Sequence, residues 1–154
     1  MHYRDIEPLR EILHRALVRY LKVTSRGFWI DDGVDLPRPS IEARILGFGG
    51  ARTSYRKRKP VCRSLDGVAA VTDAGKICTE CKARGKCTPQ VRLDLIVEQR
   101  ALRCLLAFTS ARNFLEYEAT LRRDGVVLEQ ALHEISVVNR GSWGELRFRV
   151  AENG

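Results

Sequence analysis

Two spacings of apolar residues divide this chain of 154 residues. Between positions 5 and 24, apolar side chains recur three or four residues apart, as at Leu9, Leu13 and Leu17, with arginine and glutamate between them. This spacing predicts an amphipathic helix over 5–24, which would pack on the core or dock on a partner protein. From Ile41 onward apolar and charged residues alternate instead, which is typical of half-buried β-strands.

The alternation predicts four strands and leaves one segment ambiguous. The alternating stretches are 41–48, 91–98, 102–108 and 145–150. The first should end at its glycines, Gly47, Gly49 and Gly50. Residues 126–138 fit a helix by the spacing of their leucines, whereas their two valine pairs favour a strand with an irregularity near His133. The strand is the preferred interpretation, and it brings the total to five.

One helix is predicted between the third and fourth of these strands. Ser110 or Asn113 can cap its first turn, and aromatic and leucine side chains then recur on one face as far as Arg123. Asp124-Gly125 would end it. Upstream, residues 25–40 are rich in aspartate, proline and glycine and read as a connector.

The predicted order is strand, long insertion, strand, strand, helix, strand, strand. That is the order of an OB-fold, a five-stranded barrel with a helix between the third and fourth strands. The sequence therefore predicts a mainly β protein with an N-terminal helix and connector over 1–40 and an OB-fold domain over 41–154. The insertion, 51–90, and the loop 139–144 would flank the groove in which OB-folds hold oligonucleotides.

Four of the five cysteines lie in the insertion, spaced C-x15-C-x2-C-x5-C; they are Cys62, Cys78, Cys81 and Cys87. Four thiolates with a C-x2-C pair are typical of a closed, structural zinc site, and an iron–sulfur cluster is the alternative. The fifth, Cys104, falls on the apolar face of a predicted strand and is expected in the core. The charged first residues show no apolar signal core, so a cytoplasmic location is expected. In that reducing compartment an odd number of cysteines with a C-x2-C pair favours metal over disulfides.

The positive charge of the chain is concentrated in the same insertion. The net charge is +8, and between Arg52 and Arg92 there are eleven lysines or arginines and three acidic residues, so the remainder of the chain is neutral. A localised basic segment of this kind favours a polyanionic partner, most simply nucleic acid. No apolar stretch is long enough for a membrane span, so no membrane partner is expected.

The insertion opens with Val61-Cys62-Arg63-Ser64-Leu65-Asp66-Gly67 before the C-x2-C pair. With this motif and the strand order, residues 41–150 resemble zinc-bearing OB-fold single-stranded DNA-binding proteins, such as the zinc-containing OB domain of replication protein A. The motif also resembles small proteins of phages and mobile elements. The resemblance implies a non-catalytic, sequence-tolerant protein of replication, recombination or mobile-element biology, which binds single-stranded DNA or RNA.

The expected nucleic-acid contacts are cations and loop aromatics near the predicted groove. Phosphates would be bound by Arg52, Arg56, Lys57, Arg58, Lys59, Arg63, Lys82, Arg84, Lys86 and Arg140. Tyr55 and Trp143 are the candidates for stacking on bases.

Two other functions remain open from the sequence. One is a zinc-stabilised adaptor that docks on a replication, transcription or defence complex through helix 5–24 or the basic insertion. The other is an iron–sulfur nuclease accessory. An enzyme is not expected, because no nucleophile–base arrangement stands out, and Asp94 and Glu98 lack the lysine that a nuclease site would add.

Overall fold

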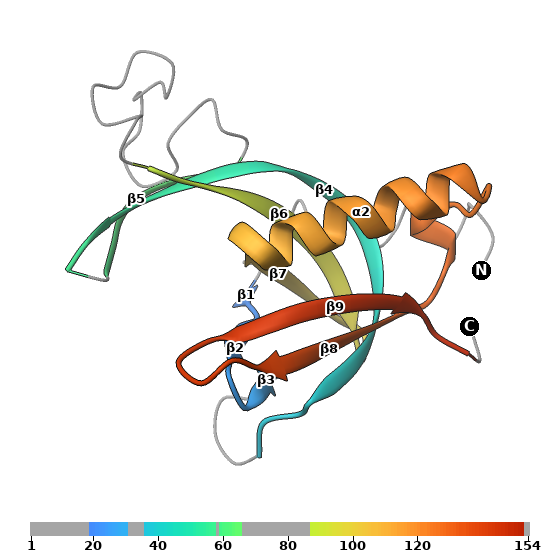
Figure 1. Cartoon of the computed structure of the whole chain (residues 1–154), viewed down its shortest axis with the longest axis horizontal. Helices are drawn as coiled ribbons and strands as arrows, with labels where there is room; N and C mark the ends of the chain where they lie inside the picture. The colour runs from blue at the N-terminus through green and yellow to red at the C-terminus, as the bar shows by residue number, and fades with distance from the viewer. Residues whose placement is uncertain (1–18, 31–35, 58, 66–86, 153–154) are drawn as a thin grey trace.

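The structure of the protein, a computed structural model, describes residues 19–30, 36–57, 59–65 and 87–152, apart from the side chains of residues 59–61. These residues form mainly β-structure with one α-helix (Figure 1). In chain order the elements are β1 (Arg19–Tyr20), β2 (Lys22–Thr24), β3 (Gly27–Trp29), β4 (Ser40–Arg56), β5 (Lys59–Ser64), β6 (Thr88–Val97), β7 (Arg100–Leu106), α2 (Phe108–Arg123), the single 3-10 turn η3 (Leu128–Gln130), β8 (His133–Asn139) and β9 (Gly144–Val150). Within this described part no helix is long and apolar enough to cross a membrane.

The long strand β4 connects the two parts of the sheet. Its residues 40–43 pair with β8, residues 44–53 pair with β6, and residues 52–56 pair with β5. A shift of register between Ile45 and Gly47 introduces a bulge, and bulges bend a strand, so β4 curves past its neighbours (Figure 1). The resulting strand order is β1-β7-β6-β4-β8-β9, with β5 beside the far end of β4.

The prediction that this strand ends at its glycines is wrong, because β4 continues to Arg56. Gly49 pairs with Arg92 and Gly50 pairs with Val91 in the ladder with β6. A Cβ at Gly49 would lie 3.1 Å from Nη2 of Arg92, so this glycine makes room for a guanidinium group rather than for a turn. Glycine inside a strand often marks such a close approach.

The other strand predictions are largely confirmed. The stretches 91–98, 102–108 and 145–150 correspond to β6, β7 and β9. The ambiguous segment 126–138 is a strand only in its second half, because η3 precedes β8. The preferred strand over the whole segment is therefore wrong for 126–132, where only the single 3-10 turn η3 forms.

The helix predicted over 5–24 is wrong for residues 19–24, and the rest of it lies outside the described residues. Tyr20 belongs to β1, which pairs in parallel with β7, and Val23 lies opposite Phe28 in the β2–β3 hairpin. Phe28 is fully buried, and its backbone exchanges hydrogen bonds of 2.7 and 2.9 Å with that of Arg38. Part of the predicted connector 25–40 is therefore a core strand. Tyrosine, valine and threonine favour such strands, and here pairing overrides the helical spacing.

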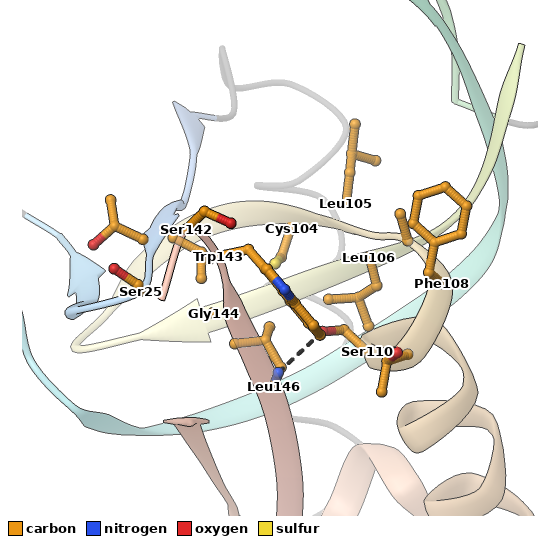
Figure 2. Close-up of a pocket in the computed structure, with 14 residues that line it drawn as sticks. Ser25, Cys104, Leu105, Leu106, Phe108, Ser110, Ser142, Trp143, Gly144 and Leu146 are labelled. Carbon is orange, nitrogen blue, oxygen red and sulfur yellow. Dashed lines mark hydrogen bonds between the residues drawn. The ribbon is translucent and has the colours of Figure 1, made fainter. Parts of the chain in front are cut away.

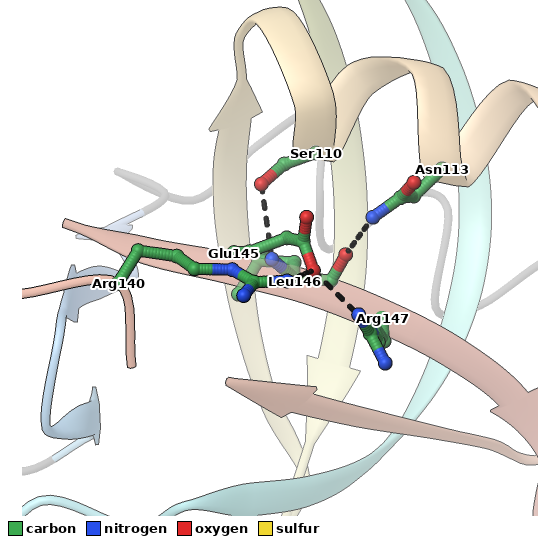
Figure 3. Close-up of polar contacts among 6 residues, drawn as sticks. All are labelled: Ser110, Asn113, Arg140, Glu145, Leu146 and Arg147. Carbon is green, nitrogen blue, oxygen red and sulfur yellow. Dashed lines mark hydrogen bonds and ion pairs between the residues drawn. The ribbon is translucent and has the colours of Figure 1, made fainter. Parts of the chain in front are cut away.

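The closed five-stranded barrel expected from the sequence is not found in the described residues, because β9 pairs with β8 but not with β7. The edge of β9 that faces away from β8 is bonded to side chains of α2 instead (Figure 3). The N–H of Leu146 donates to Oγ of Ser110, and the carbonyl of Leu146 accepts from Nδ2 of Asn113, each at 3.0 Å. The prediction that Ser110 or Asn113 caps the helix is wrong. The N-cap is Ala107, without a side-chain cap.

The core lies between the sheet and α2. Phe114 of α2 is fully buried, and its ring contacts Phe48 of β4 and Phe148 of β9 edge-on, with centroids 5.1 and 5.4 Å away. Cys104 is buried among these apolar residues as predicted, and burial raises the pKa of its thiol to about 12. Phe114 therefore holds the β4 side and the β9 side of the sheet against one helix.

Candidate functional site

The β4–β5 hairpin extends away from the helix-covered part of the sheet (Figure 1) and carries six cations and no acidic residue between Arg52 and Arg63. Arg56 lies directly opposite Lys59, and like charges in that position destabilise a hairpin. Lys57 takes a left-handed φ of 51° in the turn, where asparagine or glycine is preferred. These residues do not stabilise the hairpin, but their concentrated positive charge suits it to bind a polyanion.

Tyr55 stands near the end of this hairpin with its hydroxyl fixed in place. Its ring is 45% exposed, and its hydroxyl accepts a hydrogen bond of 3.3 Å from Nε2 of Gln90. The amide oxygen of Gln90 in turn accepts a 2.6 Å hydrogen bond from the hydroxyl of Thr53, which is fully buried. An exposed ring held in this way loses little entropy when a flat group stacks on it.

Strand register places Tyr55 and several arginines on one face of the sheet. Residues directly paired across strands share a face, as do alternate residues of one strand. Thr53 pairs with Arg63 of β5 and with Thr88 of β6, and Thr88 lies four residues before Arg92. Arg63 and Arg92 therefore share the face of Thr53 and of Tyr55, which is two residues further along β4.

The same face continues over β7 to β1. Asp94 of β6 pairs with Arg103 of β7, which pairs with Tyr20 of β1. The guanidinium carbon of Arg63 lies 4.6 Å from the ring centroid of Tyr20, a cation–π contact that joins the two ends of the strand order β1-β7-β6-β4-β5. We call this surface the tyrosine–arginine face; its members are Tyr20, Tyr55, Arg63, Arg92 and Arg103.

Asp94 is the one carboxylate that contacts the arginines of this face in the described contacts. Its two oxygens lie 3.4 Å from Nε of Arg92 and 3.1 Å from Nε of Arg103. Arg92 also donates from Nη1 to the carbonyl of Leu65. These contacts hold Arg92 and Arg103 in fixed positions.

Two of the four predicted metal ligands lie beside this hairpin. Cys62 pairs with Ser54 of β4, and Cys87 immediately precedes Thr88 of β6, which pairs with Thr53. The fold thus brings Cys62 and Cys87 to the same level on the two strands that flank β4, and both are half-buried. Cys78 and Cys81 lie outside the described residues, and among the described ones no three potential ligands come together.

Trp143, the second predicted stacking residue, lies in a different environment. It is 44% exposed and lines a cavity of about 680 Å³ between β7, the start of α2 and β9 (Figure 2). In the same loop, Nη2 of Arg140 lies 3.2 Å from a carboxylate oxygen of Glu145, which also accepts a 2.9 Å hydrogen bond from Nε of Arg147 (Figure 3). The bond from Arg147 holds the pKa of Glu145 below its ordinary value. Arg140 is therefore engaged in an ion pair beside Trp143.

The predicted contact residues thus fall into separate groups. Tyr55 and Arg63 share the tyrosine–arginine face, whereas Arg140 and Trp143 belong to the β8–β9 loop. Arg52 alternates with Thr53 and is directed to the opposite face of β4. Outside the described residues or side chains lie Arg58, Lys59, Lys82, Arg84 and Lys86.

Sequence reasoning missed four exposed or half-buried residues: Tyr20, Arg92, Arg103 and Phe108. The signal for Arg92 and Arg103 was present, because both occupy polar positions of regularly alternating strands. Tyr20 was hidden by the helical spacing around it. Phe108 is distinguished by a φ of 48° and an exposure of 77%, neither of which the sequence reveals.

Comparison of the chain with protein-family models, with curated proteins and with solved structures gives no match.

Proposed function

We propose that this protein binds single-stranded nucleic acid, most simply single-stranded DNA, without sequence preference and without catalysis. The observation that carries the proposal is the juxtaposition of exposed tyrosines and fixed arginines on one face, continuous with an acid-free cationic hairpin. Arginine and lysine bind the phosphates that every nucleotide shares, and aromatic rings stack on any base.

The strand pairing supports an OB-like arrangement as the basis of this function. β4 pairs with β6 and β8, β6 pairs with β7, β8 pairs with β9, and the helix lies between β7 and β8. This is the OB-fold order except for the pair that would close the barrel. In OB-folds the ligand groove crosses the second and third strands, which here are β6 and β7. Arg92 and Arg103 of the tyrosine–arginine face lie on these two strands.

Single strands fit this surface better than duplexes do. The rings of Tyr20 and Tyr55 are partly exposed, and stacking requires bases whose faces are free. In a duplex those faces are occupied by neighbouring base pairs, and readout would instead need a helix or ribbon placed in a groove. The tyrosines therefore favour an unpaired strand.

Zinc bound by Cys62, Cys78, Cys81 and Cys87 would support the hairpin, with an iron–sulfur cluster as the alternative. Cys62 and Cys87 lie at the same level on opposite sides of β4, and we propose that Cys78 and Cys81 complete one tetrahedral centre with them. Such a metal supplies folding free energy to the segment that it crosslinks. Elemental analysis distinguishes the two, since a cluster would bring iron and absorbance at about 400 nm.

The test is the salt dependence of binding to a labelled oligo-dT, measured by fluorescence anisotropy. We expect binding at about 50 mM salt that weakens steeply by about 200 mM. Replacing Arg56 and Lys57 together by alanine should reduce the slope of log K against log salt by about 1.4, the value for two phosphate contacts on a single strand.

The matched control removes the same charge elsewhere. Arg122 and Arg123 lie in the last turn of α2, and their double replacement by alanine should leave the slope unchanged. Absence of binding at about 50 mM salt, where the phosphate contribution is large, would refute the proposal. Equally tight binding of a duplex of the same length would refute its single-strand part.

A further inference from the structure

The cavity beside Trp143 is lined by uncharged residues, unlike two other pockets of the described part of the chain. Fourteen described residues line it, and none of them is charged, although 30% of the residues in the chain are. Ser25, Thr109 and Ser142 line it together with apolar side chains. Figure 2 shows Ser25 and Ser142 among the lining residues. A volume of about 680 Å³ is in the range of small-molecule sites. A neutral, partly polar ligand therefore suits it better than an ion does.

The cavity is the gap between β7 and β9. A strand inserted into this gap would have to pair with the N–H and C=O of Leu146 in β9. Both groups are already hydrogen-bonded, to Ser110 and Asn113 respectively. On the opposite side Arg103 C=O accepts a 2.8 Å hydrogen bond from Leu21 N–H. Leu105 lies two residues after Arg103 in β7, so its N–H and C=O also point away from β6. Leu105 lines the cavity on that side. These bonds oppose an added strand, but among the described residues they leave the N–H and C=O of Leu105 as one donor and one acceptor for a small group.

Two exposed aromatic side chains stand at this cavity. Figure 2 shows Trp143 extending across it toward Ser110, and Phe108 at the start of α2. Phe108 is 77% exposed and has a φ of 48°, a left-handed conformation that is costly for a residue with a side chain. Neither burial nor backbone preference explains a phenylalanine there. Strain of this kind at an exposed aromatic residue points to a ligand contact.

We propose that this cavity binds one nucleobase of the bound strand, with Trp143 and Phe108 as its aromatic partners. This inference rests on the proposed function and adds a site that is separate from the tyrosine–arginine face. A base is flat, neutral and polar at its edge, which matches aromatic rings, an uncharged lining and nearby hydroxyls. Hydroxyl groups both donate and accept hydrogen bonds, so the cavity tolerates different bases. The phosphates remain outside, on the cations.

The experiment compares an oligo-dT of about 12 nucleotides, within the range that one OB-fold covers, with a fully abasic chain of the same length and charge. The full-length protein with Trp29→Phe has Trp143 as its only tryptophan. Oligo-dT should quench its fluorescence, and the abasic chain should not. Trp143→Ala should weaken oligo-dT binding about tenfold, within the range for loss of one stacked base, and leave abasic binding unchanged. Trp143→Phe should retain most of the affinity.

Phe108→Gly separates binding from folding. Glycine adopts a positive φ without strain, so this variant should melt at the same temperature as wild type or higher while binding oligo-dT several-fold more weakly. Equal affinity for oligo-dT and the abasic chain would overturn the cavity assignment together with the stacking of bases on the tyrosines. Trp143 fluorescence unchanged by saturating oligo-dT would overturn the cavity assignment while leaving the proposed function intact. Binding of neither chain at low salt would overturn both.

Discussion

The two candidate binding regions of this protein differ in the chemistry that they offer. The tyrosine–arginine face and its hairpin present guanidinium and ammonium groups beside tyrosines, whereas the cavity between β7 and β9 has no charged residue among those described. In our proposal the first region binds phosphates with its cations and stacks bases on its tyrosines, and the second encloses one base in an uncharged cavity. The difference shows how one small sheet can separate affinity for phosphate from enclosure of a base.

The two regions also differ in how the fold holds them. In the hairpin, Arg56 and Lys59 occupy opposite register positions and Lys57 has a positive φ, two features that do not favour hairpin stability. The cavity is bounded by hydrogen bonds from α2 side chains to the edge of β9 (Figure 3), which are satisfied and partly buried. A change in conditions that weakens surface electrostatics, such as added salt, should therefore affect the first region much more than the second.

The largest expected effect is on the free energy of unfolding and comes from Phe114, the core residue that contacts both sides of the sheet. Phe114→Ala removes the ring that contacts Phe48 on one side of the sheet and Phe148 on the other. Loss of a fully buried phenylalanine costs about 3–5 kcal/mol, and we expect that decrease in the free energy of unfolding measured in urea. Leu115→Ala, the neighbouring but exposed position, should cost less than about 1 kcal/mol. A loss below about 1 kcal/mol for Phe114→Ala would show that the two halves of the sheet are held independently.

A smaller expected effect is the pH dependence of the free energy of unfolding that His133 produces. His133 is fully buried; its Nε2–H donates to the carbonyl of Leu128 at 2.8 Å, and its Nδ1 accepts from the hydroxyl of Tyr117 at 2.5 Å. Burial lowers the pKa of His133 below its ordinary value of 6.5. Burial also raises the pKa of Tyr117 to about 12, so its hydroxyl remains a donor. The bond that Nδ1 accepts from Tyr117 requires the neutral imidazole, whereas Nε2–H can donate to Leu128 in either protonation state.

The sign of the pH dependence follows from that lowered pKa. Above pH 6.5 the histidine is neutral in the folded and unfolded chains, and its contribution to stability is fully present. As the pH falls below 6.5 the unfolded chain takes up a proton that the folded chain resists, so the free energy of unfolding should decrease through the folded pKa. His133→Gln should be less stable at pH 7 but should lose this decrease between pH 6.5 and 5. An unchanged pH profile in that variant would contradict the assignment.

The sequence predicted the scaffold better than the surfaces. Alternation identified β6, β7 and β9, because each has one face in the core and one face outside it. It failed at β1 and β2, where residues 19–24 repeat with helical spacing but are held by pairing with β7 and with β3. No local pattern reveals such long-range pairing.

The candidate site was predictable only where charge or motif marked it. The cationic run of the hairpin, Tyr55 and Trp143 were identified from the sequence, but their division between two regions depends on register and on the open gap beside β9. The roles of Ser110 and Asn113 were mistaken because helix-capping residues and strand-bonding residues have the same chemistry. Sequence alone cannot distinguish those two uses.

The smallest expected effect tests the tyrosine–arginine face without disturbing the cavity. Gly49→Ala would place a methyl group 3.1 Å from Nη2 of Arg92, which must move by a few tenths of an ångström. Because the displaced atom ends a flexible side chain, and alanine reduces the entropy of the unfolded chain, the free energy of unfolding should change by less than about 1 kcal/mol. Binding of oligo-dT and of the abasic chain should weaken equally, by a few-fold, since Arg92 would meet phosphate. Gly50→Ala is the matched control, because a Cβ there meets nothing within 4 Å. If Gly49→Ala weakened only oligo-dT binding, Arg92 would contact bases rather than phosphates, and the assignment of phosphate binding to the arginines of this face would not hold.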